Sequence, residues 1–214
     1  MTDEMRAKVE KVMKNLERNK MKPYFCENRE EAQALVKTLI KKGETISCGG
    51  SKTLDETGIY QIINSPDYNF LGRSAPGMTR PEVEEVYRQT FRADTFFMST
   101  NALTENGELY NVDGNSNRVA ALLYGPKSVI VVCGINKIVK NIDEAIKRVK
   151  TIAAPQNTIR LGIETPCGKT GECVSLRKEN PELCDGCHGD TRICCNYVVS
   201  AQQRHIDRIK VIII

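Results

Sequence analysis

The sequence predicts an α/β fold: a mostly parallel sheet with helices on both faces and a cysteine-rich excursion near the C-terminus. Short apolar runs alternate with stretches of helical periodicity, which is the pattern of βαβ units. The chain has 214 residues and is about 40% apolar, enough for one substantial core. We therefore expect a single domain over residues 1–214.

Strands and helices are predicted in alternation through the first half of the chain. The stretch 1–20 is amphipathic, and we interpret its charged face as solvated rather than as a binding surface. Asn28 is expected to cap a helix, with Glu31 at the capping-box position and Gly43 as its end. Thr79 is expected to cap another helix. The predicted helices are 1–20, 28–43, 51–63 and 79–91, and the predicted strands are 22–27, 44–50 and 69–72.

The second half continues the alternation. Pro155 is expected to end a helix that begins near Asn141. The apolar run NTIRLGI (157–163) is predicted to be a strand, and RIKVIII closes the chain as another. The other predicted strands are 94–99, 108–112 and 128–134, and the other predicted helix is 117–125.

Composition argues against several classes of partner. The formal net charge is +4 with both signs interspersed, there is no Trp, and no basic block carries aromatic residues, so we expect no nucleic-acid binding. No apolar run is long enough to span a bilayer and no signal peptide is evident, so we expect a cytoplasmic protein without a membrane partner.

Nine cysteines in a reducing compartment are not expected to form a disulfide framework. Cys26, Cys48 and Cys133 lie in apolar runs and are interpreted as small buried hydrophobes. The other six gather between Cys167 and Cys195, which makes that segment a separate feature of the sequence.

Three polar segments directly follow predicted strands: CGGSKTLDE, STNALTENGE and CGINKIVK. In a parallel sheet the carboxyl ends of the strands share one edge, where ligands usually bind. We expect these segments to line a common pocket there.

The CGGSKT segment has two interpretations. Gly50 and Ser51 belong to an anion-binding turn, or the segment is a plain strand–helix turn capped by Ser51. Neither the P-loop spacing nor the dinucleotide fingerprint is present, so no nucleotide cofactor motif is found.

The stretch from Asn101 to Leu122 is unusually rich in Asn, Asp and Gly. Asn106–Gly107 is explained as a hairpin turn. The remainder forms a ligand site or an elaborate structural turn. As a ligand site, Asp113 supplies a carboxylate for acid–base work and Arg118 pairs a substrate carboxylate or phosphate. The other candidate ligand-binding residues are Asn101, Asn111, Asn117 and Lys137.

The cysteine-rich loop (residues 165–196) contains one C-x₂-C pair among irregular spacings. Thiolates in a reducing compartment suit zinc or an iron–sulfur cluster, and ligation would order a polar segment that has little core of its own. The alternative is a reactive, thiol-rich loop without metal.

The motifs ISCGGSKTLDETGI, DTFFMSTNALTENGELYNVDGNSNRVAALLYGPKSVIVVCGINKIV and TPCGKTGEC, with the C-terminal RIKVIII, resemble the LUD-domain proteins, the lactate-utilisation proteins of the LutC/YkgG type. The resemblance implies a fold like that of the NagB, RpiA and CoA-transferase group. It also implies a part in oxidising L-lactate to pyruvate beside iron–sulfur redox proteins. By the same resemblance the metal ligands are Cys167, Cys173, Cys187 and Cys194.

A more distant similarity links RADTFFMSTNALTENGELYN to sugar-phosphate isomerases of the methylthioribose-phosphate type. It implies a catalytic role for Asp94, with Asn111 in the corresponding place. The ligand is then a small organic acid or a sugar-phosphate-like molecule.

Three functions remain open at this stage. The chain is a component of an organic-acid oxidation system, an isomerase- or transferase-like enzyme acting on a phosphorylated or acyl substrate, or a non-catalytic ligand-binding regulatory module.

Overall fold

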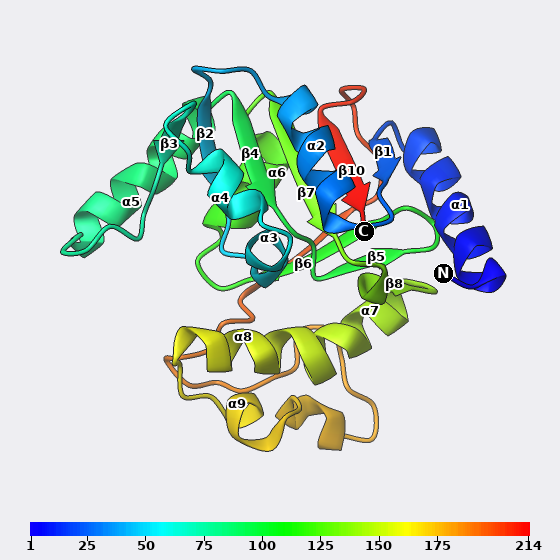
Figure 1. Cartoon of the computed structure of the whole chain (residues 1–214). Coiled ribbons are helices and arrows are strands. Elements are labelled where there is room, and N and C mark those ends of the chain that lie inside the picture. Colours follow the sequence, from blue (N-terminus) through cyan, green and yellow to red (C-terminus); the bar gives the residue numbers. More distant parts are fainter.

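The computed structural model describes residues 1–214, and its core is a six-stranded sheet in the order β1-β10-β7-β4-β2-β3. Every pair of neighbouring strands in this sheet is parallel (Figure 1). The predicted α/β class is therefore confirmed. The strands are β1 (Lys22–Phe25), β2 (Thr45–Cys48), β3 (Asn69–Leu71), β4 (Thr95–Met98), β7 (Ser128–Cys133) and β10 (Ile209–Ile213).

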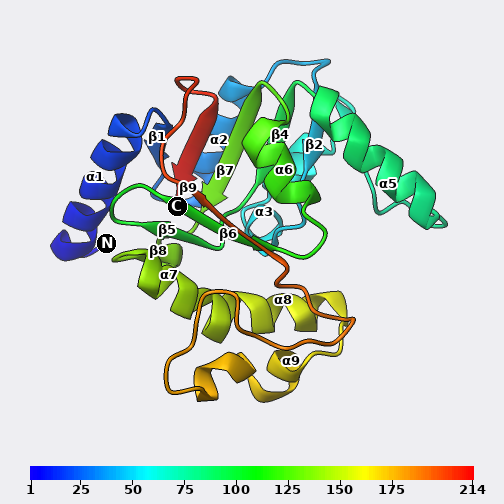
Figure 2. The same ribbon diagram turned by 180° about the vertical axis from the view of Figure 1, so that it is seen from behind.

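Both faces of this sheet are buried, because successive residues of each strand point to opposite sides. In β7, Ile130 and Val132 pack under one set of helices, whereas Val129 and Val131 pack under the other. The first face carries α2 (Arg29–Leu39), α3 (Lys52–Glu56) and α4 (Ile59–Ile63). The second carries α1 (Asp3–Arg18) and α6 (Asn117–Tyr124), as Figure 2 shows from behind.

Helix caps explain several element boundaries. Asn28 Oδ1 accepts from the Glu31 N–H at 2.9 Å, and Ser51 Oγ caps α3. The Glu82 carboxylate accepts from the N–H and the hydroxyl of Thr79 at the start of α5 (Arg80–Gln89). The prediction that Gly43 ends α2 is wrong, because the helix stops at Leu39.

A second, four-stranded sheet in the order β8-β5-β6-β9 was not foreseen as a sheet. Its strands are β5 (Ala102–Thr104), β6 (Leu109–Asp113), β8 (Ile138–Val139) and β9 (Asn196–Ser200). The predicted Asn106–Gly107 turn joins β5 to β6, and Gly107 adopts a φ of +79°, which favours glycine. This sheet lies between the main sheet and the cysteine-rich part of the chain.

The prediction that Pro155 ends a helix is wrong. Helix α7 (Ile142–Arg148) continues through a π-helical segment (Val149–Ala153) into α8 (Ala154–Leu161). Proline is tolerated within the first turn of α8, where its missing N–H is not needed. The run 157–163, predicted as a strand, belongs mostly to α8, whose buried residues are Ala154, Pro155 and Thr158.

The cysteine-rich loop is an excursion, as expected, but it leaves from α8 and returns through β9. It contains α9 (Pro166–Thr170) and a short 3₁₀ turn (Val174–Arg177). Together with α7 and α8 it forms a lower lobe beneath the carboxyl ends of the parallel strands (Figure 1). None of the helices in the structure is long and apolar enough to cross a membrane.

Candidate functional site

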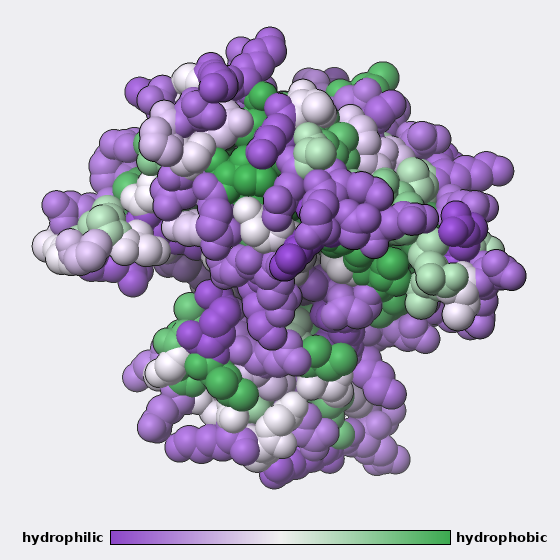
Figure 3. Space-filling view, in the orientation of Figure 1, coloured by the Kyte–Doolittle hydropathy of each residue, from purple (hydrophilic) through white to green (hydrophobic).

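A cleft of about 960 Å³ lies between the carboxyl edge of the main sheet and α8. All three polar segments that follow strands contribute to its lining, as predicted. In Figure 3 the surface is hollowed between the two lobes, with apolar residues gathered on the side of the lower lobe. The remaining walls come from α5, the loop before α6, and α8.

The Asn/Asp-rich stretch surrounds one guanidinium group. Arg118 Nε donates to Asp113 Oδ2 at 3.1 Å, and Nη1 donates to Asn111 Oδ1 at 2.6 Å and to the Ser99 carbonyl at 3.3 Å. Nη2 donates to Asn101 Oδ1 at 3.1 Å and to the Val112 carbonyl at 2.8 Å. All five N–H donors of Arg118 are therefore in use. Arg118 was predicted to pair a substrate anion, and in this structure its donors hold the floor of the cleft together.

The partners of Arg118 are equally committed to this floor. Asp113 Oδ1 accepts from the Ser116 N–H at 2.8 Å, so both of its oxygens are occupied. Asn101 Oδ1 also accepts from the Val112 N–H, and Asn111 is fully buried. Asn117 lines the cleft. This geometry gives Asp113 a structural part rather than that of a free general base.

Asp94 does not reach the cleft. It precedes β4, at the amino end of the parallel strands, where Oδ2 accepts from the Thr45 N–H at 2.8 Å. The structure thus separates Asp94 from the other predicted site residues by the length of the sheet.

Lys137 lies where the sequence predicted, at the carboxyl edge of the sheet. Its ammonium donates to Thr53 Oγ1 and Ser99 Oγ, each at 2.7 Å, and no carboxylate pairs with it. Desolvation by burial lowers the pKa of Lys137, with nearby Arg148 and Arg118 adding to the effect against an opposing influence of Cys133. One ammonium N–H remains for an anion in the cleft.

The two glycines of the CGGSKT segment allow arginine side chains to approach the backbone closely. Neither Gly49 nor Gly50 has a positive φ, and the Gly49 N–H pairs with the Phe97 carbonyl. A Cβ on Gly49 would lie 3.0 Å from Cδ of Arg118, whereas a Cβ on Gly50 would meet two other arginines. Ser51 caps α3, as the plain-turn interpretation predicted, and it also lines the cleft. Anion binding by this segment stays a prediction.

Sequence reasoning missed four cleft cations: Lys52, which pairs with Glu56, and three arginines. Arg73 precedes α5, Arg148 ends α7, and Arg160 lies on α8. Arg148 donates to the carbonyl of Asn101 at 2.6 Å and to that of Asn136 at 3.3 Å, without a carboxylate partner. No local motif marks these residues, because tertiary structure alone brings them together.

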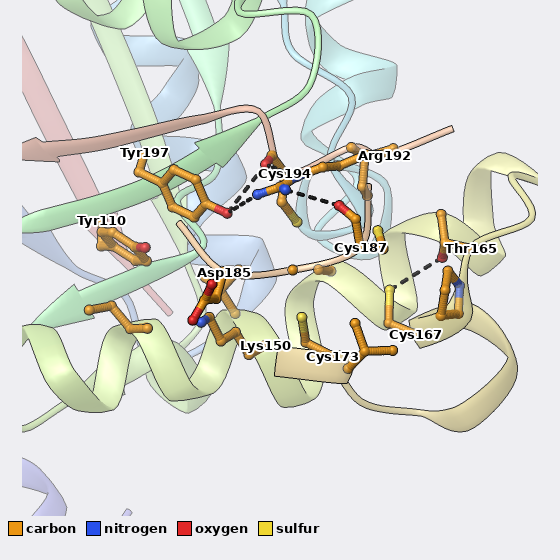
Figure 4. A pocket seen from close by; sticks show the side chains of 17 residues that line it. Tyr110, Lys150, Thr165, Cys167, Cys173, Asp185, Cys187, Arg192, Cys194 and Tyr197 are labelled. Atoms are coloured by element: carbon orange, nitrogen blue, oxygen red, sulfur yellow. Dashed lines mark hydrogen bonds between the residues drawn. The ribbon is translucent and has the colours of Figure 1, made fainter. Parts of the chain in front are cut away.

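The four cysteines expected as ligands, Cys167, Cys173, Cys187 and Cys194, line one cavity in the lower lobe (Figure 4). Cys184 and Cys195 are exposed and lie outside that lining. Burial, followed by neighbouring Cys167 and Cys173, raises the pKa of Cys194 to about 12. The fold therefore separates the six clustered thiols into the same two groups that the resemblance implied.

The cavity contains two cationic side chains without a partner of opposite charge. Arg192 donates to the carbonyls of Cys184, Cys187 and Cys194, and Lys150 donates only to the Glu182 carbonyl at 2.8 Å. Neither cation forms an ion pair with a carboxylate. The Tyr110 hydroxyl, on a side chain that is 1% exposed, has no hydrogen-bond partner. These features fit an anionic group in the cavity.

Thiol donors and uncompensated cations suit a metal–thiolate group, since Zn²⁺ or a [4Fe–4S]²⁺ cluster with four thiolates is a dianion. The sulfurs do not meet at the spacing of a single-ion site: no three His, Cys, Asp or Glu side chains are arranged to hold one metal ion. Sulfurs on one Zn²⁺ lie close together because each bond is only about 2.3 Å long. The thiolates of a cluster would be held further apart by its own atoms.

The cleft and the cysteine cavity share a wall. Val149, Ala154, Ile193 and Cys194 line both spaces. The Cys194 residue thus faces the proposed ligand cleft on one side and the other three cysteines on the other.

A family model described as the LUD domain matches residues 9–214. Among solved structures, a DUF162 family protein from Deinococcus radiodurans shares the fold, with a TM-score of 0.50 and 14% identity over 98% of this chain and 96% of that one. The β subunit of eIF2B from Chaetomium thermophilum gives a TM-score of 0.35 at 17% identity, over 54% of this chain and 41% of that one. No protein with curated annotation matches the chain.

Proposed function

Because this chain belongs to the LUD-domain family, we propose that it binds a small organic acid in the cleft and couples it to an iron–sulfur centre held by Cys167, Cys173, Cys187 and Cys194. The proposed substrate class is a 2-hydroxy acid such as lactate, from the resemblance described above. The observation that carries the proposal is the shared wall, which makes Cys194 common to both spaces.

The charge of the cleft supports an anionic ligand. Six cationic and two acidic side chains line it: Lys52, Arg73, Arg118, Lys137, Arg148 and Arg160 against Asp55 and Asp113. Arg118 is neutralised by Asp113, and Lys52 pairs with Glu56. The other four have no carboxylate partner, so an incoming carboxylate meets uncompensated positive charge.

Lys137 is the residue that we assign to the carboxylate. Its ammonium is held by two neutral hydroxyl groups, so binding an acid breaks no existing ion pair. The Ser99 and Thr53 hydroxyls fix the direction of the remaining N–H.

Oxidising a 2-hydroxy acid to a 2-oxo acid removes two electrons and two protons. A bound iron–sulfur cluster would accept these electrons one at a time and pass them on, and the two protons would leave to water. The sequence has no flavin or nicotinamide motif, so electrons must leave to a separate redox protein. In this proposal Lys137 orients the acid, the Arg118 network keeps the floor rigid, and Arg192 fixes the backbone around the cysteines.

The volume of the cleft supports a second candidate. At about 960 Å³ it lies at the upper end of the range for small-molecule sites and far exceeds a three-carbon acid. A phosphorylated or acyl substrate, handled by an isomerase- or transferase-like activity, fills it better. Turnover of such a substrate by protein without metal would favour this candidate.

The experiment is iron, sulfide and zinc analysis, with a visible absorption spectrum, on protein purified without oxygen. We expect iron with sulfide in the wild type and its loss in C173S and C187S. C184S and C195S are matched controls that should retain it, since both residues are exposed outside the cavity. Zinc alone would make the centre structural, and no metal in any preparation would refute the centre.

A further inference from the structure

We infer that Arg73 and Arg160 form a clamp for a dianionic group, such as a phosphate, at the end of the cleft beside Gly50. This inference rests on the proposed function, because it describes one end of the same ligand site. It names a chemical group that a monocarboxylic acid such as lactate lacks.

Two arginines from separate lobes approach the same point of the backbone. Arg73 comes from the loop after β3, and Arg160 comes from α8 in the lower lobe. Nη2 of Arg73 and Nη2 of Arg160 lie 3.1 and 3.4 Å from the position that a Gly50 Cβ would occupy. Such proximity of like charges is unfavourable unless something negative lies between them.

The protein itself supplies no such negative charge. Neither arginine forms an ion pair, although Asp55 also lines the cleft. Arg160 donates Nε and Nη2 to the amide oxygen of Asn157, a neutral acceptor, and its Nη1 group is free. Arg73 makes no hydrogen bond and lies over the Tyr87 ring, with its Cζ 5.5 Å from the ring centroid.

These contacts position the two guanidinium groups but do not neutralise their charge, because both partners are neutral. The Tyr87 ring supports Arg73 through a cation–π interaction, and Asn157 fixes the plane of Arg160. The free N–H groups suit an acceptor with several oxygens and two negative charges, since guanidinium binds phosphate in a bidentate manner. The absence of a side chain at Gly50 lets both guanidinium groups approach this point of the backbone.

The clamp and Lys137 recognise different parts of one ligand. The segment from Gly50 to Thr53 runs between them, because Thr53 contacts Lys137 whereas Gly50 lies beside the two arginines. A ligand with a carboxylate at Lys137 and a phosphate at the clamp would occupy more of the cleft than lactate does.

The test is calorimetric titration of inorganic phosphate, and separately of lactate, into the full-length protein in chloride buffer at constant ionic strength. We expect phosphate to bind the wild type and to bind R73Q and R160Q about ten-fold more weakly or worse. R73K and R160K, which keep the charge but lose the bidentate geometry, should lose less. Lactate affinity, which we assign to Lys137, should fall much less than phosphate affinity in all four variants.

R80Q and R177Q are matched controls. Arg80 pairs with Glu84 on the outside of α5, and Arg177 is exposed in the lower lobe, so neither touches the cleft. Both should bind phosphate like the wild type. Failure of the wild type to bind phosphate, or equal phosphate affinity in R73Q, R160Q and the controls, would overturn the clamp. Failure of lactate alone to bind would contradict the proposed lactate-class ligand and leave the clamp standing.

Discussion

At the scale of single residues, Arg118 explains why so many polar side chains lie between two buried strands. Its side chain is 14% exposed, and its charge is neutralised by Asp113. Burial lowers the pKa of Arg118, while Asp113 opposes that effect. The Asn and Asp residues of the stretch satisfy a buried cation, and together they shape the floor under the ligand.

Replacing Arg118 by Met should therefore destabilise the protein. The change leaves Asp113 and Asn111 without their donor, and breaking a buried pair typically costs about 3 kcal/mol or more. Urea unfolding followed by circular dichroism measures the free energy of unfolding. Arg88→Met is the control, because Arg88 is exposed and its Nη1 lies as far as 4.0 Å from Glu85 Oε2. This substitution should lower the free energy of unfolding by less than about 0.5 kcal/mol. An unfolding free energy for Arg118→Met equal to that of the wild type would contradict this assignment.

Lys137 should make lactate binding depend on pH. Its pKa is lowered by burial, so the ammonium is lost as the pH rises through a value below the ordinary lysine pKa of about 10.4. Affinity for the carboxylate should thus be full below that lowered pKa and fall above it. Calorimetry from about pH 7 to about pH 10 measures the profile.

Lys137→Met should bind lactate weakly and lose this pH dependence. Lys140→Met, which removes an exposed lysine outside the cleft, should keep the wild-type profile. If Lys137→Met and the wild type gave the same profile, another group would be responsible.

At the scale of elements, the π-helical segment explains how Pro155 fits inside a continuous helix. The Ala154 N–H bonds to the Val149 carbonyl, five residues back. The next bond of that kind would join Pro155 to Lys150, but proline has no N–H. The Lys150 carbonyl instead accepts from the Cys173 N–H at 2.8 Å. The irregular turn thereby ties the cysteine-rich loop to α8.

Deleting Thr151 should test this geometry. Removing one residue from the π-helical segment turns α8 by about 100° relative to α7, because each helical residue subtends that angle. We expect loss of metal binding and of phosphate binding, measured by metal analysis and calorimetry, with far-ultraviolet circular dichroism nearly unchanged. Thr151→Ala keeps the helix length and should keep both ligands. Retention of both ligands by the deletion variant would refute the role of this segment.

The sequence predicted the elements whose signals are local. The cap at Asn28, the hairpin turn at Gly107 and the apolar strand β7 were all foreseen. The prediction failed at Pro155, because a proline can end a helix or lie in its first turn. Strand β9 was missed, since its pairing with β6 depends on a return from a distant loop.

The same division applies to the site. Lys137 was predicted from its position after a strand, and the four cysteines from the family resemblance; the structure places them in the cleft and in the cavity respectively. Arg73 and Arg160 could not be found, because nothing in their neighbourhoods differs from ordinary surface arginines. Their proximity is created by two lobes meeting at Gly50. Arg118 was found, but its saturated donors are visible only in three dimensions.

At the scale of the whole molecule, a thiol-lined cavity and a basic cleft lie on either side of a shared wall. The cysteine cavity is lined mainly by the lower lobe, whereas the cleft is lined by both lobes. The cleft takes its cations from both, and Cys194 belongs to the wall between the two spaces. A ligand in the cleft should therefore change the environment of the centre.

The visible absorption spectrum of anaerobically purified protein, recorded while lactate is added, tests this coupling most directly. We predict a cluster absorption that changes in a saturable way with lactate, and a lost or much weaker response in Lys137→Met, which leaves all four cysteines in place. A cluster spectrum that stays constant while calorimetry shows lactate bound would contradict the claim that the cleft and the cysteine centre act as one site.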